Sequence, residues 1–140
     1  MRIAVVDGQG GGIGRALVEK LKRELSGDHE IIGLGTNSTA TTQMLKAGAD
    51  DAATGENAIV YNARKADVIV GAMGIIISNA MMGELTPRMA CAISESPAKK
   101  VLIPLNRCNI EVAGVKNESL PGHIEDAICI IKEYLSSQKT

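Results

Sequence analysis

The residues best suited to chemistry lie together in one glycine-rich segment near the start of the chain. They are, in order, Asp7, Gly8, Gln9, Gly10, Gly11, Gly12, Ile13 and Gly14. A short apolar run precedes them and an amphipathic stretch follows, which is the order of a strand, a turn and a helix. Backbone N–H groups at the start of a helix favour anions, and the missing side chains let a phosphate approach closely. The segment therefore predicts a site for a nucleotide or another phosphorylated ligand.

A purely structural turn is the alternative explanation of this segment. Turns that need only positive φ angles and close packing also contain runs of glycine. Five glycines in seven positions, directly after an apolar run, are more than such a turn requires. We therefore favour phosphate binding over a turn without a ligand.

The spacing of the glycines narrows the class of ligand. It does not fit G-x-G-x-x-G, the common dinucleotide pattern, from either possible first glycine. Gly8, Gly12 and Gly14 do fit G-x-x-x-G-x-G, which resembles the cofactor loop of the short-chain dehydrogenase/reductase family. In that family the loop holds the pyrophosphate and adenosine part of NAD or NADP, so the resemblance implies a dinucleotide here. The whole string from Asp7 to Gly14 is also similar to a small bacterial family without an assigned function.

A second set of candidate cofactor contacts follows the second apolar run. Dinucleotide-binding folds normally carry an acidic residue there, about 20 residues after the loop, which holds the adenosine ribose. This chain has Thr36, Asn37 and Ser38 instead, without Asp or Glu. A missing acid removes repulsion against a 2′-phosphate, and Arg15 offers a positive charge. We expect NADP rather than NAD if a dinucleotide binds, although the same polar groups would also cap a helix.

Further candidate contacts face the same predicted crevice. Gly71 and Gly74 follow another predicted strand and would let an aromatic ring lie against the backbone. Arg107 is a candidate clamp for a carboxylate or a phosphate. Asp7 would repel a pyrophosphate unless it caps the turn, meets a ribose hydroxyl or holds Mg²⁺. Of these roles we favour the Asx-type turn.

Tyr61 and Lys65 form Y-x-x-x-K, the catalytic pair of the resembled family. A lysine one helical turn from a tyrosine lowers the pKa of the phenol, as an acid catalyst requires. In that family the pair follows the fifth strand, whereas here it precedes the predicted strand 67–70. We therefore interpret it as a chance pair on a surface helix.

The rest of the chain alternates between apolar and amphipathic segments that position the loop. We expect strands at 3–6, 30–34, 51–53, 67–70 and 100–105, and helices at 14–25, 39–47, 57–65, 79–94 and 121–136. Strands separated by helices indicate an α/β fold of three layers, a Rossmann-like doubly wound and mostly parallel sheet. The strand order 3-2-1-4-5 would leave a crevice beside the first strand, where ligands bind.

The C-terminal third departs from this alternation. The link 106–109 is too short for a parallel crossover, so we expect residues 110–115 to form an antiparallel edge strand. The last helix carries an apolar face that packs in the core. The strand and this helix are also a candidate interface for a homodimer.

Length and composition restrict the class of protein. The 140 residues suggest a single Rossmann-like nucleotide-binding domain, 1–140. The net charge of −1 and the absence of Phe and Trp argue against nucleic-acid binding. No apolar run approaches membrane-spanning length, so no membrane partner is expected. Three cysteines without a C-x-x-C pair indicate reduced thiols in a cytoplasmic protein without a metal site, with Cys91 and Cys129 in the core.

These observations leave three functional hypotheses, and none specifies a reaction. The first is a nucleotide-binding protein that takes an NAD(P)-type dinucleotide and acts as a sensor or as one component of an assembly. The second is a minimal NADP-dependent oxidoreductase whose active site is completed by oligomerisation. The third is a structural α/β protein without a ligand. We favour the first, because the loop supports it and no proton donor is well placed for the second.

Overall fold

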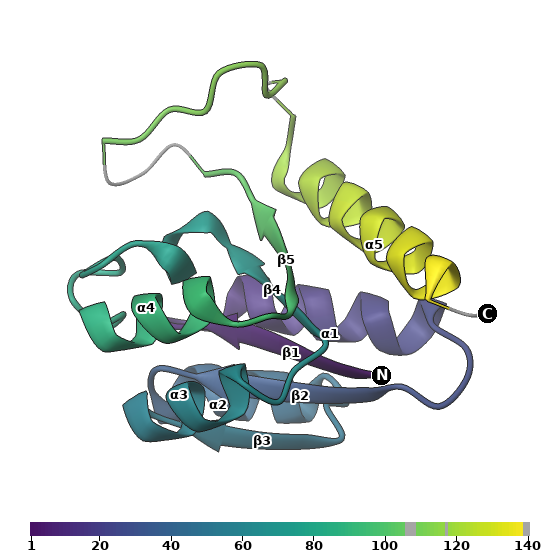
Figure 1. Cartoon of the computed structure of the whole chain (residues 1–140), viewed down its shortest axis with the longest axis horizontal. Helices are drawn as coiled ribbons and strands as arrows, with labels where there is room; N and C mark the ends of the chain where they lie inside the picture. The colour runs from purple at the N-terminus through teal and green to yellow at the C-terminus, as the bar shows by residue number, and fades with distance from the viewer. Residues whose placement is uncertain (106–108, 117, 139–140) are drawn as a thin grey trace.

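Five strands form one parallel sheet in the computed structural model, which describes residues 1–105, 109–116 and 118–138 (Figure 1). The strands are β1 (Arg2–Asp7), β2 (Glu30–Gly35), β3 (Asp51–Thr54), β4 (Val68–Ala72) and β5 (Lys99–Ile103). Their order is β3-β2-β1-β4-β5, and every neighbouring pair is parallel. The predicted Rossmann-like sheet and its strand order are therefore confirmed.

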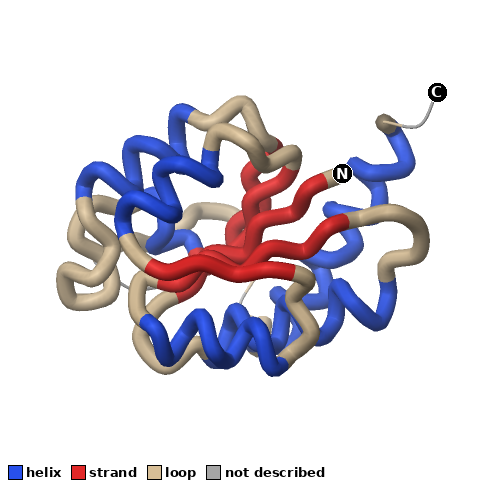
Figure 2. The backbone as a smooth tube through the Cα atoms, turned by 90° about the horizontal axis from the view of Figure 1, so that it is seen from below, coloured by secondary structure: helices blue, strands red, loops and turns tan. Residues whose placement is uncertain are grey.

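The helices cover both faces of this sheet (Figure 2). They are α1 (Gly12–Glu24), α2 (Ser38–Lys46), α3 (Glu56–Ala63), α4 (Pro87–Glu95) and α5 (Leu120–Ser137), with a short 3₁₀ helix, η1 (Met73–Ile76). Ile3 and Val5 of β1 pack in one core cluster with α1, α2 and α5, whereas Ala4 and Val6 pack in a second with α3 and α4. Because β1 is buried on both faces, its sequence is a continuous apolar run.

The helices begin in two different ways. At α2, α4 and α5 a polar side chain caps the first turn: Asn37 accepts from the N–H of Ala40, Thr86 from Met89 and Ser119 from Gly122. At α1 the residue before the helix is Gly11, in the left-handed region at φ 79° and without a side chain. α3 begins in the same way, after Gly55 at φ 101°, so the starts of α1 and α3 are the two among these five helices that no side chain caps.

Two predicted elements are wrong, and in both cases left-handed residues are the reason. Residues 110–115 form turns and coil instead of an antiparallel edge strand, because Gly114 has a φ of 82°. The described part of this segment extends away from the sheet (Figure 1), and residues 106–108 of the link lie outside the described residues. The predicted helix 79–94 begins only at Pro87, because Asn79, Met81 and Met82 have φ angles of 65°, 59° and 57°.

The apolar face of α5 packs against the chain's own sheet, and its residues belong to the core cluster of α1. Two apolar residues of the predicted homodimer interface are exposed, Ile130 of α5 at 45% and Val115 in the segment before α5 at 44%. The homodimer stays a prediction, and these exposed residues are the ones that could form its interface. Cys91 and Cys129 are exposed, which corrects the expectation that they lie in the core. In the part of the chain that the structure describes, no helix is long and apolar enough to span a membrane.

Candidate functional site

The glycine-rich loop lies at the carboxyl end of β1, between β1 and the start of α1. The strand order reverses between β1 and β4, and in open parallel sheets ligands bind at the carboxyl ends of the strands at such a switch point. A cavity of about 230 Å³ opens here. Its walls are Asp7, Gly8, Gln9 and Ile13 of the loop, Ala72 at the end of β4, Gly74, Ile77, Ala80, Met81 and Met82 after β4, and Leu105 after β5. Other hollows, which are larger and lie beside α5, contain no residue of the glycine-rich loop, so the loop cavity is the candidate site.

Asp7 caps the loop from inside. Its Oδ1 accepts from the N–H of Gly8 at 2.8 Å, and its Oδ2 accepts from the N–H of Gly14 at 2.6 Å. The side chain is only 5% exposed, and this burial raises the pKa of the carboxyl, while the two backbone hydrogen bonds oppose the rise. Of the three roles considered from the sequence, the turn cap is the one that the geometry shows.

Three of the loop glycines are required by the protein itself. A Cβ atom at Gly8 would lie 2.5 Å from Oγ1 of Thr36, and one at Gly14 would lie 2.8 Å from Cβ of Asp7. Gly11 adopts a left-handed conformation that L side chains rarely take. Close packing or backbone conformation thus explains glycine at these positions without any ligand.

Gly10 and Gly12 differ from the other loop glycines. A Cβ atom at either position would meet no described atom within 4 Å, and neither residue has a positive φ. Neither packing nor conformation within the described residues therefore requires glycine there. The consequence is open space directly before the first turn of α1.

The same stretch carries unpaired backbone donors. Among the described residues, no hydrogen-bond acceptor is present for the N–H groups of Gly10, Gly12 and Ile13. The first N–H groups of a helix have no partner within the helix and carry the positive end of its dipole. The start of α1 thus combines open space with free donors, which is what an anion-binding site requires.

Glu84 is a site residue that sequence reasoning missed. Its Oε1 accepts from the N–H of Gln9 at 2.8 Å, from Oγ1 of Thr36 at 2.7 Å and from Nδ2 of Asn37 at 2.8 Å. These donors lower the pKa of the Glu84 carboxyl, the Gln9 N–H most strongly. No sequence signal marks this residue, because it lies 48 positions after Thr36 and reaches the site through an irregular turn.

The structure brings some of the predicted contacts together and separates others. Thr36 and Asn37 lie beside the loop, where Nδ2 of Asn37 also donates to the carbonyl of Gln9, and Gly74 lines the cavity. Ser38 is exposed at the start of α2. Gly71 lies within β4, where a Cβ atom would be 2.6 Å from the carbonyl oxygen of Val6, so sheet packing explains it.

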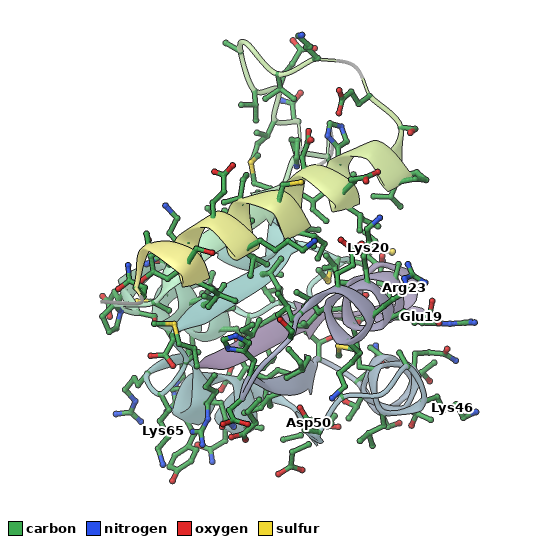
Figure 3. The ribbon with its side chains drawn as sticks, turned by 90° about the vertical axis from the view of Figure 1, so that its right-hand side faces the viewer. Glu19, Lys20, Arg23, Lys46, Asp50 and Lys65 are labelled. Atoms are coloured by element: carbon green, nitrogen blue, oxygen red, sulfur yellow. The ribbon has the colours of Figure 1, made fainter. Side chains whose placement is uncertain are left out.

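The predicted cations and the Tyr–Lys pair lie away from the cavity or outside the described residues. Arg15 does not line the cavity and forms an exposed ion pair with Glu19 at 3.1 Å, and Arg107 lies outside the described residues. Tyr61 is 50% exposed and accepts a hydrogen bond from Lys65, which lowers the pKa of its hydroxyl. Lys65 projects from the molecular surface (Figure 3).

The Tyr–Lys pair is at the opposite end of the sheet from the loop. The charge of Arg2, at the amino end of β1, acts on Tyr61, whereas the cavity lies at the carboxyl end of that strand. The interpretation as a surface pair therefore fits its place. Within the described residues, no group of three or more His, Cys, Asp and Glu side chains is arranged to hold a metal ion.

Comparisons with known proteins identify a family but no activity. A family model described as Domain of unknown function (DUF3842) matches residues 2–136. No curated protein matches the chain. Among solved structures, a dodecameric FMN-dependent UbiX-like decarboxylase from Escherichia coli O157:H7 has 15% sequence identity and a TM-score of 0.47, over 94% of this chain and 77% of that chain. At this level of similarity the decarboxylase supports no inference about the site.

Proposed function

We propose that this chain, which belongs to the family described as Domain of unknown function (DUF3842), binds a nucleotide through its phosphate groups at the start of α1. The observation that carries the proposal is the pair Gly10 and Gly12, where glycine has no conformational or packing reason within the described residues. Free N–H groups and the positive end of the α1 dipole lie at the same place. A phosphate occupying this space would explain both the donors and the missing side chains.

The ligand class that fits best is a dinucleotide, NAD or NADP. The G-x-x-x-G-x-G spacing supports this class, and so do the two neighbouring parts of the site. The cavity beside the loop has apolar walls from Ile77, Ala80 and Met81, which suit a flat ring. Thr36 and Asn37 lie on the other side of the loop, where an adenosine ribose would lie.

We favour binding, as a sensor or as one component of an assembly, over catalysis. Among the described residues that line the cavity, Asp7 is the one titratable side chain, and both of its oxygens already accept backbone hydrogen bonds. A minimal oxidoreductase would need a proton donor near the reacting ring. The Tyr61–Lys65 pair lies at the other end of the sheet and cannot supply one.

Thermal unfolding in the presence of nucleotides tests this proposal. The protein is heated with NAD, NADP, FAD, ATP, AMP or GTP, each with and without Mg²⁺. A ligand at 100 times its dissociation constant adds about 2.7 kcal/mol to the free energy of unfolding. For a chain of this length we expect a shift of the midpoint on the order of 5–10 °C with a dinucleotide.

Two variants show whether such a shift comes from the loop. Gly12→Val places a branched side chain in the open space before α1 and should abolish the shift. Gly122→Ala, in α5, changes a helical glycine away from the cavity and should leave the shift unchanged. If no nucleotide moves the midpoint of the unchanged protein, the proposal is wrong and the loop is a structural turn.

A further inference from the structure

The end of β2 carries no acidic residue in the sequence, yet a carboxylate occupies the space beside it in the structure. Glu84 comes from the segment between η1 and α4, and its Oε1 contacts Thr36 and Asn37, the two residues that follow β2. Its third donor is the N–H of Gln9 in the glycine-rich loop. A single carboxylate thus joins the two segments between which an adenosine ribose lies in dinucleotide-binding folds.

The two oxygens of Glu84 have different roles. Oε1 accepts all three of these hydrogen bonds, and within the described residues Oε2 has no hydrogen-bond donor. The residue is partly buried, and no side-chain oxygen or nitrogen of the described residues is both buried and without a partner, so Oε2 is accessible to solvent. A carboxylate oxygen can accept from two hydroxyl groups, and such charge-assisted hydrogen bonds are stronger than neutral ones. The two neighbouring hydroxyl groups of a ribose could donate these two hydrogen bonds.

The carboxylate stays charged in this position. The N–H of Gln9, followed by the hydroxyl of Thr36, lowers the pKa of Glu84, and no cation contributes to that shift. Arg15, the positive charge that the sequence suggested for a 2′-phosphate, forms an exposed ion pair with Glu19 and does not contribute to the pKa shift of Glu84. A 2′-phosphate would therefore meet an uncompensated negative charge at the end of β2.

The turn that carries Glu84 holds it in place. Met81 and Met82 adopt left-handed conformations, which are unfavourable for residues other than glycine. Hydrogen bonds close the turn, from the N–H of Gly83 to the carbonyl of Asn79 and from the N–H of Glu84 to the carbonyl of Met81. The surrounding structure thus fixes an otherwise unfavourable backbone that directs Glu84 toward the loop.

We propose that Glu84 is the ribose-binding and specificity-determining residue of this site, and that the ligand is a nucleotide with an unmodified adenosine ribose, of the NAD rather than the NADP type. Oε2 accepts hydrogen bonds from the ribose hydroxyls, while Oε1 keeps Gln9, Thr36 and Asn37 in place. This inference rests on the proposed function. It reverses the preference for NADP that the missing acid after β2 suggested.

Titration calorimetry with NAD and NADP tests the inference. We expect the unchanged protein to bind NAD at least about tenfold more tightly than NADP, which corresponds to one charge-assisted hydrogen bond gained and one repulsion avoided. Glu84→Gln keeps the size of the side chain and removes its charge, so the preference should fall to about threefold or less. Glu30→Gln is the matched control, because Glu30 lies at the amino end of β2, away from the loop. This variant should keep the preference for NAD over NADP.

A ligand series avoids any dependence on the folding of a variant. The unchanged protein should bind AMP several-fold more tightly than 2′-deoxy-AMP, because the deoxy compound lacks one of the two hydroxyls. If NADP binds as tightly as NAD, or 2′-deoxy-AMP as tightly as AMP, the inference is overturned while the proposed function stands.

The remaining outcomes are equally decisive. If Glu84→Gln strengthens the binding of NAD and NADP alike, the Glu84 carboxylate hinders ligand binding instead of accepting hydrogen bonds from the ribose, and the inference fails. If none of these nucleotides binds the unchanged protein, the proposed function and the inference fall together.

Discussion

At the scale of single residues, Asp7 and Glu84 are two carboxylates with different tasks in one site. Asp7 is buried and gives both oxygens to backbone N–H groups of the loop, whereas Glu84 is partly exposed and keeps one oxygen free. Burial raises the pKa of Asp7, and hydrogen bonding lowers that of Glu84. Asp7 therefore shapes the loop, and Glu84 has the free oxygen that we propose binds the ribose.

The raised pKa of Asp7 predicts how stability depends on pH. Because the folded state holds this proton more tightly than the unfolded state does, the contribution of Asp7 to stability is present in full below its ordinary pKa of 3.8. It is lost as the pH rises through the higher folded value. Asp7→Asn removes this titration, so the stability of the unchanged protein relative to the variant should fall as the pH rises from 3.8 through that window.

Urea unfolding of both proteins between about pH 3 and pH 7 measures this difference. Carboxyl groups that do not interact with Asp7 titrate equally in the two proteins and cancel in the comparison, whereas Glu84, whose charge also raises the pKa of Asp7, is part of the measured difference. If the stability of the unchanged protein relative to Asp7→Asn instead rises with pH, the hydrogen bonds from Gly8 and Gly14 outweigh burial and the pKa of Asp7 is lowered.

The position of the loop could be predicted from the sequence, but not which of its residues serve packing and which are free to contact a ligand. The composition of residues 7–14 was sufficient to locate the loop, because a strand, glycines and a helix follow one another locally. Which glycines serve packing depends on Thr36, which reaches Gly8 only in the folded chain. Glu84 could not be predicted for the same reason, since its contacts with Gln9 and Thr36 join segments far apart in sequence.

At the scale of elements, the start of α1 determines what the site can bind. Gly12 is the first residue of the helix and has no positive φ, so alanine fits its conformation. The space beside it is open within the described residues. Stability and ligand binding should therefore respond in opposite directions to a methyl group at this position.

Gly12→Ala tests this opposition. The substitution reduces the conformational entropy of the unfolded chain and should raise the free energy of unfolding by roughly 0.4–1 kcal/mol. The same methyl group enters the proposed phosphate space and should weaken nucleotide binding by about tenfold, which is 1.4 kcal/mol. Chemical denaturation and titration calorimetry on the same samples measure the two effects.

Gly122→Ala is the matched control, because Gly122 is a helical glycine near the start of α5 and a Cβ atom there meets only ordinary contacts of 3.4–3.6 Å. It should gain stability and keep the affinity. If Gly12→Ala loses stability, or if its affinity for the nucleotide is unchanged, the open space before α1 does not hold a phosphate as proposed.

The elements themselves were largely predictable, and the exceptions share one cause. Buried strands such as β1 and β4 appear in the sequence as apolar runs, and glycines and polar residues separate them from the helices. Two predictions were wrong, the antiparallel strand at 110–115 and the start of a helix at residue 79 instead of Pro87. In both segments apolar residues lie in turns. A left-handed conformation at Met81 or Met82 leaves no mark in the sequence.

At the scale of the whole molecule, the order of the strands places the site. β2 and β3 lie on one side of β1, and β4 and β5 on the other, so the crevice opens between the ends of β1 and β4. We propose that the chain is a single domain, because the core clusters on the two faces of the sheet share the same central strands. Hydrogen bonds of Glu84 connect the loop, the turn that carries Glu84 and the end of β2 in one site.

The most direct test of the account is a map of the backbone amide resonances of ¹⁵N-labelled protein during titration with NAD. We expect the largest changes at the amides of Gly10, Gly12 and Ile13, whose N–H groups have no acceptor within the described residues. The amide of Gly122, already bound to Ser119, should not move. No change at the three loop amides, or changes centred elsewhere while the ligand saturates, would contradict phosphate binding at the start of α1.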